Sequence, residues 1–305
     1  MKVIITGATG FIGRALCGQL YKDYEIIALT RSAEKASKIL GQEVTAVEWN
    51  GKTSGQWAEE IDGADIVINL AGENIASGKW NQRKKNRILQ SRIDSLKALT
   101  GAIRKAGNKP RIFMQASAIG YYGSQKDNEL NESSPPGRGF LASVCRVVES
   151  ATLDIERLGV RCVIIRTGIV LGNQGGALPK LALPFRFFIG GYPGDGKQWF
   201  SWINLEDEVR AIKFLIENEN QQGVFNLTSP GSMTMKNFCQ TLGTVLHRPC
   251  WFVPDFILRI FLGEKADQVL LSGQKVIPKR LLEAGFRFNQ PKAENALVNI
   301  FKSGS

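Results

Sequence analysis

The sequence predicts an α/β protein, a doubly wound parallel sheet with a smaller, mostly helical C-terminal lobe. In the first two-thirds of the chain, short runs of β-branched residues alternate with longer segments of helical periodicity, which is the pattern of βαβ units. Runs such as Ile66-Val67-Ile68 are apolar throughout, as expected of parallel strands that are covered on both faces. A glycine-rich turn follows the first of these runs and opens the first helical segment.

Each element follows from the local pattern. Short apolar runs bounded by polar residues or glycine predict strands over residues 2–6, 25–30, 44–48, 64–70, 111–116 and 162–167. Apolar residues at spacings of three and four predict helices over residues 11–22, 56–61, 82–105 and 140–158. After about residue 170 the pattern becomes irregular, and a helix at 206–217 and a strand at 224–229 precede a mostly helical tail from residue 235.

Composition limits the class of protein. With 305 residues, of which 43% are hydrophobic and 22% charged, the chain can form one large core and a smaller lobe, and it is too apolar for a disordered protein. No apolar run approaches the roughly 18 residues of a membrane span, so we expect no membrane partner. Residues 1–6 are too short for the apolar region of a signal peptide, and we expect them to be mature structure. Five scattered cysteines without a C-x-x-C pair predict reduced, mostly buried thiols in the cytoplasm and no metal site.

The chain has a single histidine, His247, and a formal net charge of +11. One imidazole, distant from the glycine-rich turn, argues against Ser-His-Asp hydrolases, Cys-His proteases and histidine metal sites, and a surface or helix-end position is the simpler interpretation. The positive charge favours polyanionic partners, either nucleic acid or a phosphate-bearing cofactor or substrate. The basic clusters contain too few aromatic residues for a nucleic-acid platform, so we expect no nucleic-acid partner.

The glycine-rich turn spans residues 6–13 and reads T-G-A-T-G-F-I-G. Its glycines, Gly7, Gly10 and Gly13, allow a tight turn, close approach of the backbone to a pyrophosphate and close packing of the helix. The N-terminus of that helix adds unpaired N–H groups and a positive potential. Because the turn lies between a strand and a helix of a βαβ unit, it predicts dinucleotide binding rather than a turn without a ligand.

The end of the second strand bears on which dinucleotide is bound. The sequence there is Thr30-Arg31-Ser32, where an NAD site usually has Asp or Glu for the ribose hydroxyls. A guanidinium and two hydroxyl groups would suit a 2′-phosphate, so we predict NADP(H) in preference to NAD. Glu34 is the nearest acidic residue and would shift the preference back if its loop turned it inward.

A second basic residue is placed by helical periodicity. Residues 82–105 carry one apolar stripe, formed by Leu89, Ile93, Leu96, Leu99 and Ile103. Arg92 falls inside this stripe and is a candidate cofactor contact, because a buried guanidinium needs an anion or hydrogen-bond acceptors. A side chain whose stem crosses the stripe to reach solvent is an equal alternative. The neighbouring basic cluster could attract phosphates, but a solvated helix face is the preferred interpretation for Lys79, Arg83, Lys84, Lys85 and Arg87.

With these residues in place, nearly the whole chain resembles the extended, epimerase-like branch of the short-chain dehydrogenase/reductase superfamily. The shared motifs are T-G-x-x-G-x-x-G at 6–13, N-L-A-G at 69–72, Y-Y-G at 121–123, I-R-T-G at 165–168 and W-I-N-L-E-D at 202–207. Residues 71–75, 194–198 and 273–278 resemble more narrowly an atypical group labelled epimerase-family or nucleotide-sugar epimerase-like, whose activity is generally unassigned. The resemblance implies a Rossmann fold and NADP(H) contacts at Thr9, Gly10, Phe11, Ile12, Thr30, Arg31, Leu70, Ala71, Gly72, Arg92 and Val170.

The resemblance also implies a catalytic pattern, from which this chain departs. The superfamily uses a tyrosine as acid/base, a lysine four residues later that lowers the tyrosine pKa, and a Ser or Thr that orients the substrate oxygen. Alignment of the helix near residue 140 puts Phe140 at the tyrosine and Val144 at the lysine, and counting back from the Y-Y-G motif puts Ala118 at the Ser/Thr. We therefore expect all three positions to be vacant.

Other residues near the predicted nicotinamide end are candidates for catalysis: Ser117, Tyr121 and Glu73. Glu73 could act as a base if desolvation raised its pKa, or it could cap a helix or pair with Lys79. Tyr122 and Lys126 match Y-x-x-x-K, but they lie in a glycine-containing loop and are not expected to be the catalytic pair. A cleft between the lobes, or simply the interface between them, would be lined by Arg186, Lys197, Gln198 and Trp202.

These observations predict an NADP(H)-binding oxidoreductase- or epimerase-like protein whose substrate is small and anionic, such as a sugar nucleotide or a phosphorylated carbonyl compound. The vacant positions leave open a non-catalytic NADPH-binding or redox-sensing protein. We expect a dinucleotide-binding domain at 1–170, to which 202–228 returns, and a smaller substrate-side lobe at 171–201 and 229–305. Relatives in the superfamily often dimerise, so a homodimer is a further expectation.

Overall fold

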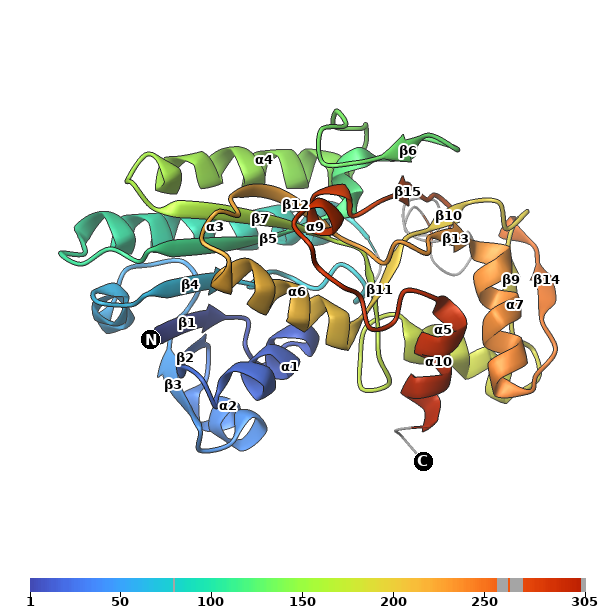
Figure 1. Cartoon of the computed structure of the whole chain (residues 1–305), viewed down its shortest axis with the longest axis horizontal. Helices are drawn as coiled ribbons and strands as arrows, with labels where there is room; N and C mark the ends of the chain where they lie inside the picture. Colours follow the sequence, from blue (N-terminus) through green and yellow to red (C-terminus); the bar gives the residue numbers. More distant parts are fainter. Residues whose placement is uncertain (79, 257–262, 264–270, 303–305) are drawn as a thin grey trace.

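A seven-stranded parallel sheet forms the centre of the protein, shown in the computed structural model of Figure 1, which describes residues 1–78, 80–256, 263 and 271–302. Its strands are β1 (Lys2–Thr6), β2 (Glu25–Thr30), β3 (Val44–Glu48), β4 (Ile66–Asn69), β5 (Ile112–Ala118), β7 (Arg161–Thr167) and β12 (Gly223–Leu227). They lie in the order β12-β7-β5-β4-β1-β2-β3, and all of their pairings are parallel. The order reverses between β1 and β4, which is the switch point at which sheets of this class bind ligands. The predicted doubly wound parallel sheet is confirmed.

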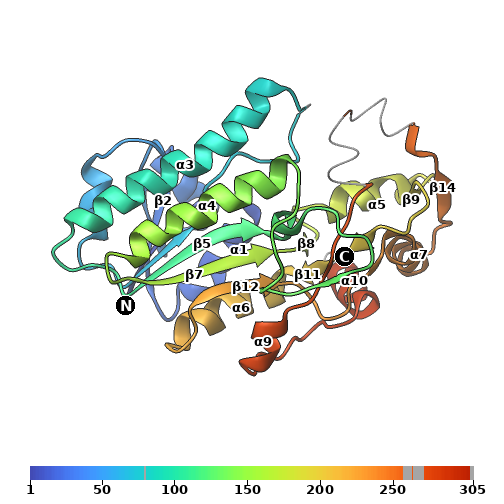
Figure 2. The ribbon, with the colours of Figure 1, turned by 90° about the horizontal axis from the view of Figure 1, so that it is seen from above.

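Helices cover both faces of the sheet. One face carries α1 (Phe11–Leu20), α2 (Ala33–Leu40) and α6 (Leu205–Glu217), and the other carries α3 (Gln82–Lys105) and α4 (Phe140–Glu156), which run side by side in Figure 2. Alternate residues of β1 enter different cores: Ile5 packs with Leu16 of α1, and Ile4 with Leu99 of α3. Burial on both faces explains why these strands are apolar throughout.

Several predicted segments differ from the structure at their ends, and two of the differences have a visible local cause. Residues 56–61 form the 3₁₀-helix η1 (Gln56–Ile61) rather than an α-helix. Trp57 anchors this short turn, because its Nε1 donates to the carbonyl oxygen of Thr53 and its ring packs against Trp49 at 5.3 Å. Strand β5 continues two residues beyond the predicted end, because Ser117 and Ala118 still pair with β7. The extension carries Ser117 to the carboxyl edge of the sheet.

The C-terminal part encloses a third apolar cluster between α5 (Leu178–Arg186), α7 (Met235–Leu246) and α10 (Ala293–Lys302). The remaining elements of the chain are η2 (Ile119–Tyr122), α9 (Lys279–Glu283) and four short strand pairs. The pairs are β6 (Glu129–Leu130) with β15 (Lys275–Val276), β8 (Ile169–Leu171) with β11 (Trp202–Asn204), β9 (Gly191–Pro193) with β14 (Trp251–Val253), and β10 (Trp199–Phe200) with β13 (Met233–Thr234). The described part of the tail therefore mixes helices with short strands, and residues 257–262 and 264–270 of the predicted helical tail lie outside the described residues.

One expected cleft residue belongs to this third cluster instead. Trp202 is fully buried, and its Nε1 donates to the carbonyl oxygen of Gly231 at 3.1 Å. Its large apolar ring fills the core that α5, α7 and α10 share, so it does not line a cleft. The boundary between the two expected domains stays a prediction. No helix in the described stretches of the chain has the length and apolar character needed to cross a membrane.

Helix α6 carries a buried carboxyl group on the side that faces the core. The side chain of Glu208 is fully buried, its Oε1 accepts a hydrogen bond from Thr167 Oγ1 at 2.8 Å, and its Oε2 has no partner among the described residues. Burial raises the pKa of Glu208 from the ordinary value of 4.5 to about 8. The folded protein therefore holds a proton there that the unfolded chain has released above about pH 5.

This difference predicts that the free energy of unfolding falls as the pH rises from about 4.5 towards 8, because the unfolded state ionises first. Glu208→Gln keeps the shape and removes the charge, so its stability should exceed that of the wild type at pH 8.5 by more than it does at pH 5. Urea unfolding at both pH values measures this, with the exposed Glu206→Gln as the matched control on the same helix. Identical pH slopes for Glu208→Gln and the wild type would contradict the assignment.

Candidate functional site

The turn between β1 and α1 is shaped by two close backbone approaches. Gly7 has a φ of +69°, and a Cβ on it would lie 2.8 Å from the carbonyl oxygen of Leu70. A Cβ on Gly13 would lie 2.4 Å from the carbonyl oxygen of Gly7. Gly10 is the N-cap residue that precedes α1, and no side chain caps this helix N-terminus. The turn therefore brings the N-terminus of a helix, with its unpaired N–H groups, to the switch point of the sheet, which is the geometry of an anion site.

Buried side-chain hydrogen bonds fix the carboxyl ends of three strands relative to one another. Thr6 Oγ1 at the end of β1 donates to Asn69 Oδ1 of β4 at 2.6 Å and accepts from the N–H of Ala71 at 3.1 Å. Asn69 Nδ2 donates to Gln115 Oε1 of β5 at 2.8 Å. Sequence reasoning missed Gln115, although a polar residue inside an apolar strand was a usable signal. This network links the three strand ends directly below the turn.

A glycine-rich segment forms one wall beside the turn. The ring of Phe11 packs against Gly172, Gly175 and Gly176, where a Cβ would lie 2.6 to 2.8 Å from ring atoms. This segment follows β8, which carries the buried Val170. Two residues predicted to contact the cofactor, Phe11 and Val170, are thus brought together although they are far apart in the sequence.

Arg31 follows β2 at the same edge of the sheet. Its side chain is exposed and forms no ion pair within the described residues. Ser32 caps α2 by accepting from the N–H of Lys35. Glu34 pairs with Lys38 at 2.5 Å on the exposed side of α2, so it does not turn inward. The edge next to β2 therefore presents an exposed guanidinium without a direct ion pair among the described residues.

A cavity of about 110 Å³ lies where the ends of β4 and β5 meet α3 and α4. Its polar lining groups are the guanidinium of Arg92, the hydroxyl of Ser117 and the thiol of Cys145, and the other residues that line it are Leu70, Ala71, Ile75, Ile88, Ala116, Ala118, Gly120, Leu141, Val144 and Val148. Helix α4 thus presents positions 141, 144, 145 and 148, which share one helical face.

The lining of this cavity corrects the placement of Phe140. The ring of Phe140 packs edge-on against Trp80 at 5.6 Å and does not line the cavity, where Leu141 stands instead. One residue along a helix turns the side chain by about 100°, so an alignment that is off by one position selects a different face. Val144 does line the cavity, together with Cys145, as expected for its neighbourhood.

The hydroxyl of Ser117 is hydrogen-bonded to a buried ion pair between Glu149 and Arg166. Ser117 Oγ donates to Glu149 Oε1 at 2.6 Å, and Glu149 accepts two hydrogen bonds from Arg166, from Nε at 2.9 Å and from Nη2 at 2.7 Å. The ring of Tyr121 lies over this guanidinium, 3.4 Å from Cζ to the ring centroid. Sequence reasoning missed Glu149 and Arg166 as site residues. Their signal was charged side chains on otherwise apolar faces of α4 and β7.

Glu73 lies beside the N-terminal half of α3. Its carboxylate pairs with Lys84 at 2.5 Å, and its N–H donates to Ser91 Oγ at 2.9 Å. The hydrogen bond from Lys84 lowers the pKa of Glu73, so the condition set for a general base, a raised pKa, is not met. Lys84 itself is buried and is not part of a solvated face, while Lys79, the partner considered from the sequence, lies outside the described residues.

The two residues of the apparent Y-x-x-x-K pair lie in different environments, Tyr122 in the core and Lys126 at the surface. Tyr122 is fully buried; its hydroxyl donates to Asn226 Oδ1 at 2.7 Å and accepts from Arg166 Nη1 at 2.9 Å. Burial raises the pKa of Tyr122 to about 12. Lys126 lies in a turn at a φ of +52°. That these two residues are not a catalytic pair stays a prediction, which the burial of Tyr122 favours.

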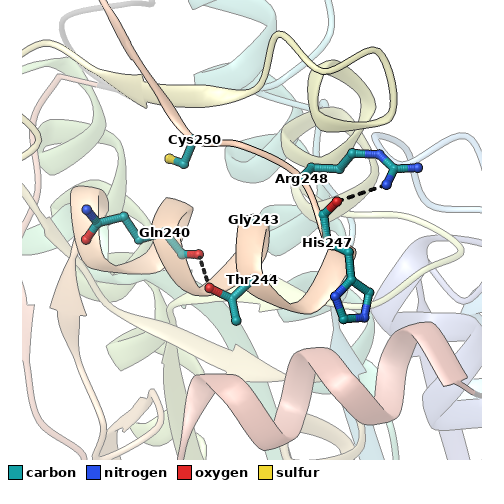
Figure 3. Close-up of a pocket in the computed structure, with 6 residues that line it drawn as sticks. All are labelled: Gln240, Gly243, Thr244, His247, Arg248 and Cys250. Carbon is teal, nitrogen blue, oxygen red and sulfur yellow. Dashed lines mark hydrogen bonds between the residues drawn. The ribbon is translucent and has the colours of Figure 1, made fainter.

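A wider depression lies on the C-terminal part of the chain, around the end of α7 (Figure 3). His247 ends this helix in the left-handed region, and its carbonyl oxygen accepts from Arg248 Nη1 at 2.9 Å. The helix-end position expected for the single histidine is confirmed. The depression contains no residue of the glycine-rich turn, and no carboxylate among its lining residues could orient the imidazole for catalysis.

The fold and this site define an α/β protein of the dinucleotide-binding class. Comparison with known proteins gives the family. The model of the NAD dependent epimerase/dehydratase family matches residues 3–228, and a domain of unknown function, DUF1731, matches residues 253–300. The chain belongs to the NAD dependent epimerase/dehydratase family.

Three relatives are similar over nearly their whole length. The chain is 40% identical to the epimerase family protein SDR39U1 homolog, chloroplastic, of Arabidopsis thaliana, over 99% of this chain and 87% of the relative. It is 36% identical to the epimerase family protein YfhF of Bacillus subtilis, over 98% of each chain. The crystal structure of the human epimerase family protein SDR39U1 with NADPH superposes with a TM-score of 0.88, at 32% identity and 99% coverage of both chains.

The close approach at Gly13 predicts the effect of one methyl group. Gly13→Ala should lower the free energy of unfolding by about 1–3 kcal/mol, because the Cβ meets backbone atoms that cannot move aside. Gly18→Ala on the same helix has open space around it and should raise stability by about 0.5–1 kcal/mol. Chemical denaturation of both variants measures the pair, and equal effects of the two substitutions would show that the turn is not tightly packed.

Proposed function

We propose that this chain binds NADP(H) across the carboxyl edge of its sheet and acts as an oxidoreductase- or epimerase-like enzyme without the usual Tyr–Lys pair. The observation that carries the proposal is the uncapped N-terminus of α1 at the switch point, with the unpaired Arg31 beside it. The diphosphate would lie at the turn and the 2′-phosphate at Arg31. The proposed contacts are Gly7, Thr9, Gly10, Phe11, Ile12, Gly13, Thr30, Arg31, Leu70, Ala71, Gly72, Arg92 and Val170.

The residues present fit such a cofactor. The backbone at Gly7 and Gly13 leaves no room for side chains, so the amides of the turn stay accessible to a ligand. The human relative, similar over the whole chain, was crystallised with NADPH, which supports the same cofactor here. The bound cofactor would supply or accept a hydride, and the chain would position the substrate against it.

Ser117 is the first candidate for contact with the substrate oxygen. It lines the cavity, and its hydroxyl is oriented by donation to Glu149. Tyr121 is the second candidate; among the described residues no hydrogen bond engages its hydroxyl, although Arg166 occupies one face of its ring. Glu73 was the third, and we do not propose it as a base because Lys84 lowers its pKa.

A non-catalytic NADPH-binding or redox-sensing protein is the alternative. The face of α4 that borders the cavity carries Leu141, Val144, Cys145 and Val148, none of which transfers protons in the manner of tyrosine and lysine. Burial raises the pKa of the Cys145 thiol, which disfavours sensing through a reactive thiolate. In this alternative the protein would respond to the cofactor itself.

The substrate and setting complete the proposal. A small anionic substrate agrees with the net charge of +11, and a homodimer follows from the resemblance alone. We place the protein in the cytoplasm because its cysteines are free and four of the five are buried. One relative, from Arabidopsis thaliana, is described as chloroplastic.

Arg31→Ala tests the choice of cofactor. The variant should bind NADPH about 10- to 100-fold more weakly, because it loses charged hydrogen bonds to the 2′-phosphate, and should bind NADH within about twofold of the wild type. Fluorescence titration with each reduced cofactor measures both constants. An equal loss for NADPH and NADH would refute the 2′-phosphate assignment.

Ser117→Ala separates the enzyme from the binding protein. If the chain is an enzyme, hydride exchange between bound cofactor and a panel of carbonyl and sugar-nucleotide compounds should be measurable, and the variant should lower it about 100-fold while NADPH affinity is kept. The exposed Ser150→Ala on α4 is the matched control. Tight NADPH binding without exchange across the panel would favour the non-catalytic alternative.

A further inference from the structure

The order of the strands gives the proposed cofactor a direction. Arg31 follows β2, the glycine-rich turn follows β1, and the cavity lies at the ends of β4 and β5. Since these strands are adjacent in the order β2-β1-β4-β5, a dinucleotide with its 2′-phosphate at Arg31 and its diphosphate at the turn extends towards the cavity. This inference rests on the proposed function. It concerns the other half of the cofactor, the ribose and nicotinamide that would reach the cavity.

Helix α4 offers no cation to that half. The four residues by which it lines the cavity are three aliphatic side chains and the thiol of Cys145. In the enzymes that the chain resembles, a lysine of this helix holds the nicotinamide ribose. Here the single Lys or Arg among the described lining residues is Arg92, which comes from the neighbouring helix α3. The cavity therefore has a positive charge, but from a different helix.

The guanidinium of Arg92 is fixed in orientation and keeps donors free. Nη1 donates to the carbonyl oxygens of Ile88 at 2.8 Å and Glu73 at 3.2 Å. Within the described chain, Nε and Nη2 have no hydrogen-bond partner, and Arg92 forms no ion pair with a carboxylate. Arg92 is half-buried, so these donors remain available for acceptors on a ligand in the cavity.

Gly72 determines how the guanidinium lies. A Cβ on Gly72 would be 2.9 Å from Cζ of Arg92 and 3.1 Å from Nη2, so the group packs against the glycine backbone. The two preceding residues, Leu70 and Ala71, line the cavity and meet the glycine-rich turn at Gly7. The free donors of Arg92 are thus held next to the backbone that the cofactor would follow.

We propose that Arg92 holds the nicotinamide ribose of NADP(H), with Nε and Nη2 donating to its hydroxyl oxygens. Arg92 is a positioning residue in this role. A guanidinium stays protonated and only donates, so it can fix the ribose but takes no proton from the substrate. Any proton transfer must then involve another group, such as the hydroxyl of Ser117, which lines the same cavity.

The test uses ligands that share the adenosine half and differ in the other. The full-length Arg92→Met variant, which keeps an apolar stem, is titrated with NADPH, with 2′-phospho-ADP-ribose and with 2′,5′-ADP. We expect about 10- to 100-fold weaker binding of NADPH and 2′-phospho-ADP-ribose, which both carry the second ribose, the one that bears the nicotinamide in NADPH. Binding of 2′,5′-ADP, which has only the adenosine ribose, should be unchanged. Retained binding of 2′,5′-ADP also shows that the variant is folded. Arg92→Lys should restore part of the lost affinity. The exposed Arg83→Met on α3 is the matched control and should bind all three ligands as the wild type does.

Each other outcome overturns the proposal in a recognisable way. Equal weakening of all three ligands would mean that Arg92 acts through the shape of the segment at 72–73. A loss for NADPH alone would assign Arg92 to the nicotinamide ring rather than to the ribose. If the wild type binds none of the three ligands, the proposed function itself fails, which is distinct from a failure of the role of Arg92.

Discussion

The absence of side chains at Gly7 and Gly13 is the constraint on which the rest of the structure depends. These two positions let the backbone of the β1–α1 turn touch both the end of β4 and the first turn of its own helix. Because the contacts are between backbone atoms, they fix the helix N-terminus at the switch point with little freedom. An anion held by helix N–H groups needs that fixed arrangement, since hydrogen bonds weaken steeply with poor geometry.

The polar groups around the turn divide into those that the protein satisfies and those that it leaves free. Thr6, Asn69 and Gln115 saturate one another beneath the turn, and Glu149 neutralises Arg166 behind Ser117. Such buried pairs are costly to break and so keep the site rigid. In the described part of the chain, Arg31 after β2 and Arg92 in the cavity keep donors without a hydrogen-bond partner at this edge. Their separation along the strand order matches an extended ligand with a phosphate at one end.

Much of this could be predicted from the sequence, because the relevant signals are local. Strand β1, strand β2 and helix α3 have the predicted bounds, since apolar runs and helical periodicity are properties of neighbouring residues. The position of Arg92 on a buried face followed from the same periodicity. The partners that it lacks, and the pairing of Glu149 with Arg166, depend on which elements meet in space, and no local pattern carries that information.

Two corrections show where such reasoning fails. Phe140, the residue aligned with the tyrosine, packs against Trp80 outside the cavity, and its neighbour Leu141 lines the cavity, because one residue along a helix is a change of face. Glu73 was considered as a base because its segment lies at the site, but the buried Lys84 eleven residues later determines its ionisation. Charge partners of this kind decide pKa values, and they are visible only in the folded chain.

A crystal structure of the chain with NADPH tests the central claim most directly. The account predicts density for the diphosphate against the amides of residues 9–12, the 2′-phosphate at Arg31 and the nicotinamide half in the cavity beside Arg92. A dinucleotide bound in the reverse direction, or a β1–α1 turn that makes no contact with the diphosphate, would contradict it.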